Sequence, residues 1–177
     1  MICYANHARR NRTVRSGREA VLRLRYRIVI AEARDFLNPR NSPRYWNART
    51  IAEFHRNHGK VGGPFEGAPL LLLHHIGARS CKSRINPVMY LRDGDRYIIF
   101  ASKGGADSNP DYYYNIKAHP DIQIEVGDET IDVRAEEITG LERDRLFARQ
   151  ASLYPAFGEY QRGTKRTIPV VALIPKT

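Results

Sequence analysis

Short hydrophobic stretches separated by Gly, Pro, Asn and Asp run through the chain from residue 69 onward. The stretch from Pro69 to His75 contains four consecutive leucines and predicts a strand buried on both faces. Residues 84–91 and 96–101 flank a turn at residues 92–95 and predict a β-hairpin. This is the clearest strand signal in the sequence.

A second hairpin is predicted further along the chain. Hydrophobic residues take every second position in 122–126 and again in 131–135, on either side of Gly127 and Asp128. A period of two is typical of strands with one buried face. Residues 168–174 predict the closing strand.

Three helices are predicted around these strands, at residues 50–58, from Asn109-Pro110 to Ala118, and from Thr139 to about Leu153. Gly59 ends the first helix as a C-terminal cap. Thr139 and Glu142 have the spacing of a capping box at the start of the third.

About six strands with three or four inserted helices is the pattern of a small barrel or an α+β sheet. The regular strand and helix alternation of a doubly wound parallel sheet is absent from the sequence. A length of 177 residues supports one compact domain with an extension. The predicted fold class is therefore α+β or mainly β.

Positive charge is concentrated near the N-terminus. Residues 1–50 contain twelve arginines and only three acidic residues, so nearly all of the net charge of +10 belongs to this segment. A disordered arm and an upstream translation start are the favoured interpretations. Adsorption to an anionic membrane surface is an alternative, and binding of nucleic acid is not expected because no nucleic-acid motif accompanies the arginines.

The remaining bulk features exclude several protein classes. Cys3 and Cys81 lack the spacing of a metal site or a disulfide framework. No apolar run approaches the roughly 18 residues that span a bilayer, and no signal-peptide pattern is present. We therefore expect a cytoplasmic protein, with peripheral attachment at the inner face of the plasma membrane as an alternative.

Two loops carry candidate chemistry. Residues 77–84, GARSCKSR, place three cations, two hydroxyls and a glycine together, which suits a phosphate or a polycarboxylate. Residues 101–106, ASKGGA, follow a strand and precede a helix start, so backbone amides and Lys103 could contact an anion. A solvated basic turn is the alternative interpretation of the first loop.

Other catalytic patterns are missing from the sequence. It has neither a GxGxxG fingerprint nor a GxxxxGK[ST] loop, and no HExxH spacing. His74 and His75 occupy adjacent strand positions and face opposite ways, which makes them poor joint metal ligands. We expect one of them in the core and the other exposed.

Aromatic residues gather in two late segments, DYYYN at 111–115 and YPAFGEY at 154–160. Tyr154, Phe157 and Tyr160 lie three residues apart, on one side of a helical turn. Packing in the core is the ordinary interpretation. A flat cofactor ring would need such residues as a wall.

The order of these motifs resembles a known family. The GARSCKSR loop, the RINP strand, the ASKGGA loop, the NP helix and the KAHP turn, followed by LYPAFGEYQ and RTIPVVALIP, are similar to deazaflavin-dependent (F420-dependent) nitroreductases of actinobacteria. The resemblance covers about residues 46–176. It implies a split β-barrel related to FMN-binding oxidases, a deazaflavin-binding domain at residues 46–177 and a basic extension at residues 1–45.

The resemblance also implies a site for coenzyme F420, an 8-hydroxy-5-deazaflavin. The phosphate and glutamyl tail would lie near Ala78, Arg79, Ser80 and Arg84. The ring would contact Ile85, Asn86, Pro87, Val88 and Met89. The far wall would come from Phe100, Ala101, Ser102 and Lys103, and from Asp111, Tyr112, Tyr113, Tyr114 and Asn115.

Three tyrosines commonly line the substrate pocket of that family, and Tyr154, Phe157 and Tyr160 match them here. Phe157 has no hydroxyl, which puts in doubt a donor role at that position. Cys81 stands where glycine is usual. Ser102, Tyr154 and Tyr160 are the expected catalytic residues.

The resemblance implies hydride transfer to a nitroarene, a quinone or an activated enone. Two alternatives remain open: an F420 carrier or sensor without turnover, and an FMN or haem binder on the same barrel. A small-molecule acceptor is the expected partner, and split barrels often pair as homodimers.

Overall fold

The computed structural model describes residues 42–176. The chain divides into two units, Met1–Trp46 and Asn47–Thr177. Everything below concerns the second unit, apart from the first turn of one helix. The basic extension expected at residues 1–45 lies almost wholly outside the described residues.

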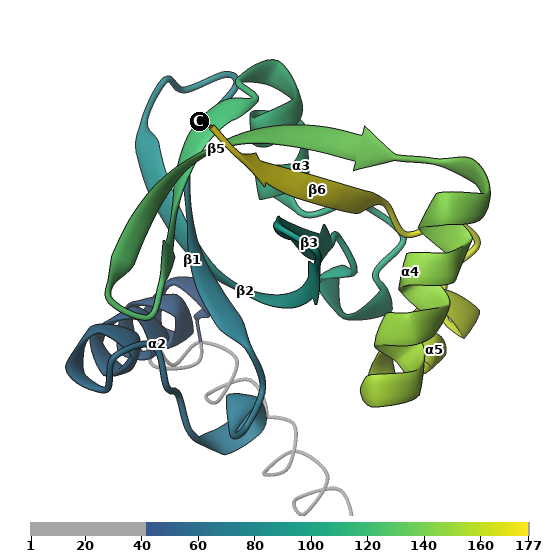
Figure 1. Cartoon of the computed structure of the whole chain (residues 1–177), viewed down its shortest axis with the longest axis horizontal. Helices are drawn as coiled ribbons and strands as arrows, with labels where there is room; N and C mark the ends of the chain where they lie inside the picture. Colours follow the sequence, from purple (N-terminus) through teal and green to yellow (C-terminus); the bar gives the residue numbers. More distant parts are fainter. Residues whose placement is uncertain (1–41, 177) are drawn as a thin grey trace, which may run out of the picture. The chain divides into compact units, whose positions relative to one another are not determined.

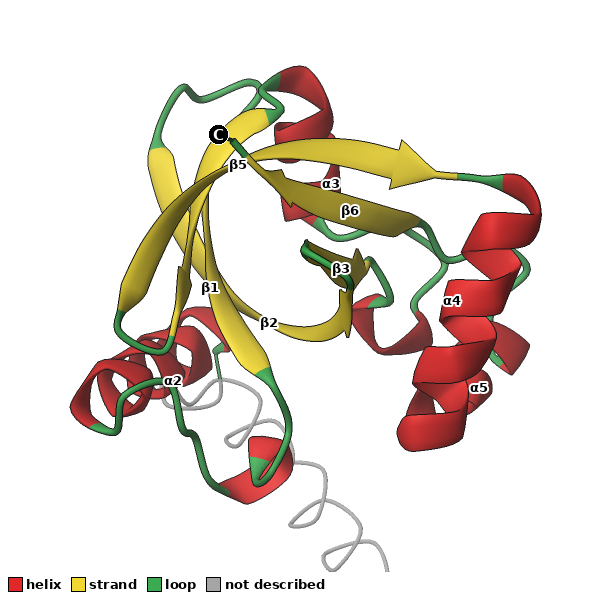
Figure 2. Cartoon of the chain, viewed as in Figure 1, coloured by secondary structure: helices red, strands yellow, loops and turns green. Residues whose placement is uncertain are grey.

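Six antiparallel strands form a closed barrel in the order β1-β2-β3-β6-β5-β4. Figures 1 and 2 show the ring of strands that results. Their bounds are β1 Leu70–Ile76, β2 Ser83–Asp93, β3 Arg96–Phe100, β4 Asp121–Val126, β5 Glu129–Ile138 and β6 Val170–Pro175. The predicted small barrel is confirmed.

Both predicted hairpins form in the predicted places. Asp93 pairs with Arg96 across a two-residue turn, and Val126 pairs with Glu129 across another. β6 closes the barrel by pairing with β3 on one side and β5 on the other. Leu70, Leu71, Leu72 and Leu73 are at most 3% exposed, which confirms that β1 is buried on both faces.

Within residues 42–176, four α-helices surround the barrel: α2 Pro43–Arg56, α3 Asp111–Ala118, α4 Gly140–Leu153 and α5 Ala156–Arg162. Two short 3-10 turns, η2 Gly63–Phe65 and η3 Lys103–Gly105, lie in the connecting loops. Figure 1 shows α2 beside β1, with α4 and α5 together on the other side of the barrel.

Side chains of β1 and β2 point alternately into and out of the barrel. They contribute to one hydrophobic cluster inside the barrel and to two clusters outside it. Leu71 and Leu73 point inward, where Tyr113 and Ile116 of α3 pack against them. Outside the barrel, Leu70 and Leu72 pack under Phe54 of α2. A third cluster on the outer face covers β3 and β6 and includes Leu146, Phe147 and Phe157 from α4 and α5. Burial of these three clusters supplies most of the stabilisation of the fold.

Three helix boundaries differ from the sequence predictions. α2 begins at Pro43 instead of residue 50, because proline is well tolerated at the first helical position and no breaker follows it. It ends at Arg56, since Gly59 has a φ of 87° and donates its N–H to the carbonyl of Phe54. α3 starts at Asp111, with Pro110 at the N-cap.

The predicted capping box at Thr139 is wrong. Thr139 is the N-cap of α4, but its side chain makes no capping hydrogen bond. Glu142 does not reach back to it either. Its carboxylate accepts a hydrogen bond from Arg96 of β3 at 2.8 Å. A tertiary ion pair has replaced the local cap.

A carboxylate joins α2 to the barrel. Glu125 of β4 lies between His55 of α2, whose Nε2 is 2.7 Å from the carboxylate, and His74 of β1. Burial opposes ionisation of Glu125, but the hydrogen bonds with His74 and His55 outweigh it and hold the pKa of Glu125 below its ordinary value. The ionised carboxylate therefore stabilises the docking of α2.

This ion pair predicts a pH-dependent stability. The folded-state pKa of Glu125 is depressed, so its contribution is complete above the unfolded value of 4.5 and is lost as the pH falls through the folded pKa. Glu125→Gln should lower the urea midpoint of unfolding near pH 7 and change it little near pH 2.5. Glu129→Gln, on the exposed start of β5, is the matched control. Equal midpoints for Glu125→Gln and the native protein at neutral pH would contradict the assignment.

Candidate functional site

The loop between β1 and β2 is tightly closed. Gly77 donates its N–H to the carbonyl of Lys82 at 2.9 Å and accepts from the N–H of Cys81 at 2.8 Å. Arg79, Lys82 and Arg84 are exposed, and none of them is hydrogen-bonded or ion-paired to another residue of the described part of the chain. Three cations on one closed loop are therefore available to a ligand anion.

Cys81 has a backbone conformation that favours glycine. Its φ is 51°, in the left-handed region that residues with a Cβ enter at a cost of about 1 kcal/mol. A Cβ on Gly77 would lie 2.3 Å from Ser80 Oγ, so a larger residue at 77 would require the Ser80 side chain to turn away. The departure at Cys81 therefore strains the loop and leaves its closed shape intact.

A chain of hydrogen bonds runs from this loop through α3 and β1 to β2. Asn115 Oδ1 accepts from the N–H of Ala78 at 2.9 Å, and Asn115 Nδ2 lies 3.1 Å from His75 Nδ1. The other ring nitrogen of His75 is 2.8 Å from Asn86 Oδ1. Burial lowers the pKa of His75 despite the hydrogen bond to Asn86, so the ring is neutral.

The predicted ring-contact run of β2 is divided between two faces. Ile85, Pro87 and Met89 pair with the outward-facing residues of β1, so they face out of the barrel. Asn86 and Val88 face inward. Side chains at 85, 87 and 89 can line an outer site, whereas the other two can reach it only through their backbone.

Arg166 holds the second loop. Its guanidinium donates to the carbonyls of Ser102 at 2.7 Å and Ala106 at 2.7 Å, and to Asn109 Oδ1 at 2.6 Å. A further bond reaches the carbonyl of Ala101. Thr164 adds a hydrogen bond from its hydroxyl to Asp107. The planar guanidinium of Arg166 thus fixes residues 101–109 and places a positive charge next to them.

The same loop requires glycine at its tip. Lys103, Gly104 and Gly105 have φ values of 48°, 61° and 82°. A Cβ on Gly105 would lie 3.0 Å from the backbone of Tyr160, so α5 packs directly against this loop. Nothing lies within 4 Å of a Cβ built on Gly104. The open side of the loop is therefore at Gly104.

α3 connects the two loops, because side chains three apart on a helix share a face. Asn115 contacts Ala78 of the first loop, and the Tyr112 hydroxyl donates to the carbonyl of Phe100 beside the second loop at 3.3 Å. Burial raises the pKa of Tyr112. The remaining tyrosines of the predicted wall point elsewhere: Tyr113 donates to Glu137 of β5, and Tyr114 is 51% exposed.

The predicted aromatic trio converges on one cluster. The Phe157 ring is buried, with its centroid 5.6 Å from that of Phe100 and 5.6 Å from that of Tyr160. Tyr154 and Tyr160 are partly buried against the same cluster, together with Met89 of β2. The two tyrosine hydroxyls make no hydrogen bond with another described residue. Phe157 is thus a packing residue, and the two tyrosines are the candidate donors.

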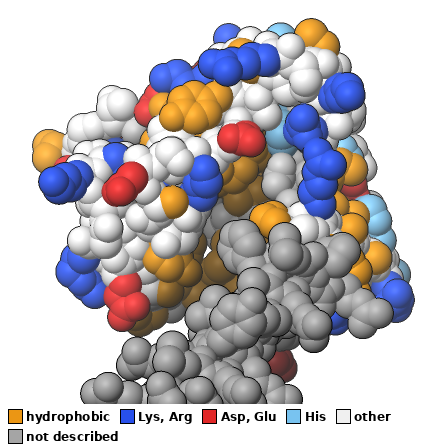
Figure 3. Space-filling model, turned by 180° about the vertical axis from the view of Figure 1, so that it is seen from behind, with side chains coloured by type: hydrophobic (Ala, Val, Ile, Leu, Met, Phe, Trp, Pro, Cys, Tyr) orange, Lys and Arg blue, Asp and Glu red, His pale blue; other side chains and the backbone are white. Residues whose placement is uncertain are grey.

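The structure brings most of the predicted site together. The cationic loop, the start of α3, the Ser102 loop and the Tyr154 and Tyr160 pair are linked through contacts made by Asn115, Tyr112 and Gly105. Lys103 is exposed and donates to Ser108 at 2.9 Å. Asp111 is exposed at the first turn of α3. Hydrophobic side chains gather in a hollow on the face shown in Figure 3, with basic side chains around it.

Two positioning residues were missed by sequence reasoning. Arg166 precedes β6 in a segment without any recognisable motif, so nothing local marks its contacts 57 to 65 residues away. His75 was expected to be either core-facing or exposed. It is 3% exposed, and His74 on the opposite face is partly buried against Glu125.

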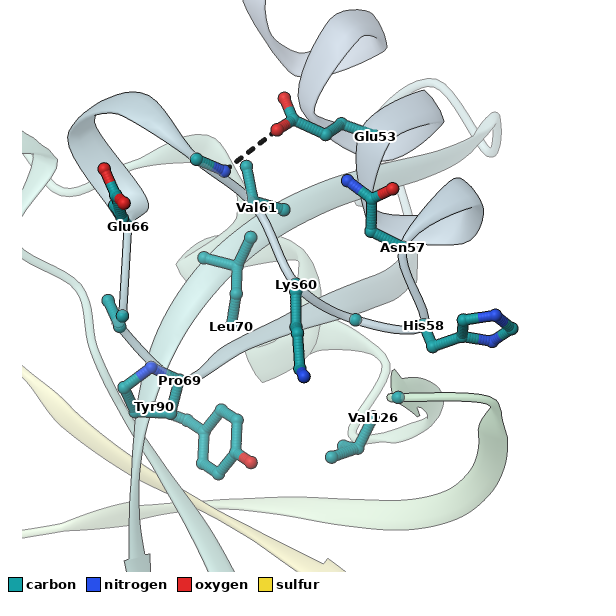
Figure 4. Close-up of a pocket in the computed structure, with 15 residues that line it drawn as sticks. Glu53, Asn57, His58, Lys60, Val61, Glu66, Pro69, Leu70, Tyr90 and Val126 are labelled. Atoms are coloured by element: carbon teal, nitrogen blue, oxygen red, sulfur yellow. Dashed lines mark hydrogen bonds between the residues drawn. The ribbon is translucent and has the colours of Figure 1, made fainter.

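A separate cavity of about 740 Å³ lies at the other end of β1. Figure 4 shows Lys60, Tyr90 and Val126 pointing into it, with Glu53 accepting a hydrogen bond from the Gly62 N–H at 2.9 Å. Its lining includes Leu70, the first residue of β1, whereas the cationic loop follows Ile76, the last. Seven strand residues separate the two by about 20 Å. The cavity therefore shares no residue with the predicted site.

Among residues 42–176, no cluster of His, Cys, Asp or Glu could hold a metal ion. Within the same range, no helix is long and apolar enough to cross a membrane. His74 and His75 face opposite ways, as the strand period requires.

Comparisons with known proteins agree on one family. Residues 46–175 match the model of the F420H(2)-dependent quinone reductase family. An F420H(2)-dependent quinone reductase of Mycobacterium tuberculosis is 40% identical over 129 residues, which cover 69% of this chain and 85% of that protein.

Solved structures give the same picture. The structure of an F420-H2 dependent reductase is 37% identical and has a TM-score of 0.55; the match covers 59% of this chain and 93% of that one. The structure of a domain-swapped dimer is 34% identical and has a TM-score of 0.57, with 75% of this chain and 99% of that chain covered.

The Arg166 contacts predict a local loss of order on substitution. Arg166→Lys keeps the charge but cannot reach all of its acceptors, so amide hydrogen exchange in residues 101–109 should accelerate roughly tenfold or more. Arg162→Lys, at the exposed end of α5, is the matched control and should leave this exchange unchanged. Equal protection in both variants would show that the Arg166 guanidinium does not hold the loop.

Proposed function

The chain belongs to the family of F420H(2)-dependent quinone reductases, and from that membership we propose that it passes a hydride from reduced coenzyme F420 to a quinone. The protein is an oxidoreductase with coenzyme F420 as its cofactor. The observation that carries the proposal is the joining of the cationic loop and the Ser102 loop by α3.

The residues present fit the coenzyme. An anionic tail requires cations that are not already paired, and Arg79, Lys82 and Arg84, which no other described residue engages, meet this requirement beside Ala78. A flat ring requires an apolar surface, and Ile85, Pro87 and Met89 offer one on the outer face of β2. We propose that these two sets of residues hold the tail and the ring.

Bound in reduced form, F420 would supply the hydride and the redox chemistry, so the protein need only position the reactants and provide hydrogen bonds. Ser102 is well placed for this because Arg166 fixes its carbonyl, while its hydroxyl makes no bond with another described residue. We assign it to orienting the ring or the acceptor. Tyr154 and Tyr160 would donate to an acceptor oxygen.

The finer choice of acceptor rests on the family. Phe157 is buried between Phe100 and Tyr160 and offers no donor, so the hydroxyls of Tyr154 and Tyr160, together with that of Ser102, are left for the acceptor. We propose a quinone, whose carbonyl oxygens can accept from these groups, because the matching family model is that of the F420H(2)-dependent quinone reductases. A nitroarene or an activated enone would use the same donors, and we propose them as secondary acceptors.

Two rival functions use the same site differently. A carrier or sensor would bind F420 without turnover and would need no hydrogen-bond donor for an acceptor, whereas Tyr154 and Tyr160 offer hydroxyls that no other described residue engages. An FMN or haem binder would share only the barrel. The family model and the curated relatives favour F420 over both.

Assembly and membrane contact remain expectations. The similar structure that is a domain-swapped dimer supports pairing of this chain with a second copy. Peripheral contact with an anionic membrane would use the arginines of residues 1–45, most of which lie outside the described residues.

The assigned roles predict a selective loss of turnover. Ser102→Ala and Tyr160→Phe should each lower kcat for menadione with reduced F420 by roughly tenfold, the value of about one hydrogen bond, while F420 affinity changes less than twofold. The measurement is the loss of F420H2 absorbance under steady-state conditions, with a nitroarene as a second acceptor.

Tyr90→Phe and Ser152→Ala are the matched controls. They remove a tyrosine hydroxyl from the separate cavity and a serine hydroxyl from the exposed face of α4. Full turnover in Ser102→Ala and Tyr160→Phe would remove these residues from the mechanism. Tight F420 binding without turnover of any acceptor by the native protein would favour the carrier.

A further inference from the structure

The backbone amide of Ala78 determines where the protons lie along a chain of hydrogen bonds. The N–H of Ala78 can only donate, so the Asn115 atom facing it must be the acceptor Oδ1. The Asn115 amide nitrogen then faces His75 Nδ1, which must accept. The proton of a neutral His75 ring therefore lies on Nε2 and is donated to Asn86 Oδ1.

This arrangement has no equivalent when the ring is charged. Both nitrogens of a protonated imidazole donate, so Nδ1–H would oppose the Asn115 amide group. Turning the Asn115 amide over would relieve that conflict, but its NH2 group would then oppose the N–H of Ala78. Either way, protonation of His75 breaks one of the two bonds of the Asn115 amide, the one with His75 of β1 or the one with Ala78 of the loop.

We propose that His75 is a positioning residue for the coenzyme: its neutral Nε2–H form locks the 77–84 loop in the closed shape that presents Arg79, Lys82 and Arg84 to an anion. The role in coenzyme binding rests on the proposed function, whereas the hydrogen-bond chain does not. His75 is 3% exposed and Asn115 is 7% exposed, so water cannot easily replace the bond between these two side chains.

The groups that face His75 set the direction of its response. Burial lowers the pKa of His75, and the electrostatic effects of Arg84 on β2 and His74 on β1 add to this, while the Asn86 hydrogen bond and Asp111 of α3 oppose it. Because the folded pKa is lower than the unfolded value of 6.5, the closed loop has its full stability above that pH. The contribution declines as the pH falls below 6.5 toward the folded pKa.

The first arm of the test needs no coenzyme. In the full-length protein labelled with ¹⁵N, the two ring nitrogens of His75 should show the Nε2–H tautomer at pH 7.5. Acidification should shift the Ala78 amide resonance together with the His75 ring. Observation of the Nδ1–H tautomer would overturn the inference. So would an Ala78 amide resonance that does not shift as the His75 ring titrates.

The second arm measures F420 affinity at pH 7.5 and pH 5.5. His75→Gln can still accept from Asn115 and donate to Asn86, but it does not titrate. Any change in the protonation of F420 itself affects both proteins equally. The ratio of the native dissociation constant to that of His75→Gln, compared at the two pH values, therefore reports the effect of His75 protonation alone. Native affinity should fall roughly fivefold to tenfold more than that of His75→Gln over this range, the value of about one hydrogen bond.

His75→Leu removes both bonds and should weaken F420 binding at both pH values. Rescue by Gln but not by Leu would separate positioning from mere packing. Identical pH slopes for the native protein and His75→Gln would overturn the inference. If F420 does not bind at all while the ¹⁵N result is as expected, then the proposed function fails and the role of His75 in closing the loop stands.

Discussion

The docking of α3 on the end of the barrel is the contact on which the candidate site depends. Tyr113 and Ile116 bury one face of this helix against Leu71 and Leu73 inside the barrel. With the helix held by that core, Asn115 and Tyr112 are placed to meet the two loops. Apolar burial thus supplies the stability, and a few polar contacts supply the geometry.

Charge at the site is arranged in two layers. Arg166 is fully engaged with the carbonyl oxygens of one loop and acts as a fixed support. Arg79, Lys82 and Arg84 on the other loop are unengaged by described residues. Cations that hold the protein together are therefore distinct from cations that can hold a ligand, which is the arrangement expected of a preorganised anion site.

The sequence predicted the fold well because its signals are local. The LLLL run, the two hairpin turns and the alternation at 122–126 each determine a strand without reference to the rest of the chain. The capping box at Thr139 failed for the opposite reason, since Glu142 is taken by Arg96, a residue far away in sequence. The site residues follow the same rule. The cationic loop can be recognised as a local motif, but the direction of the Tyr113 side chain and the contacts of Arg166 depend on packing between distant segments.

The central claim is that this barrel selects the deazaflavin coenzyme. Equilibrium titration of the purified full-length protein with F420, and separately with FMN, tests it most directly, with quenching of intrinsic Tyr and Trp fluorescence as the signal. F420 should bind at least roughly a hundredfold more tightly than FMN, because only F420 carries the polyanionic tail that suits three unpaired cations. Equal affinity for both, preference for FMN, or binding of neither would contradict the claim.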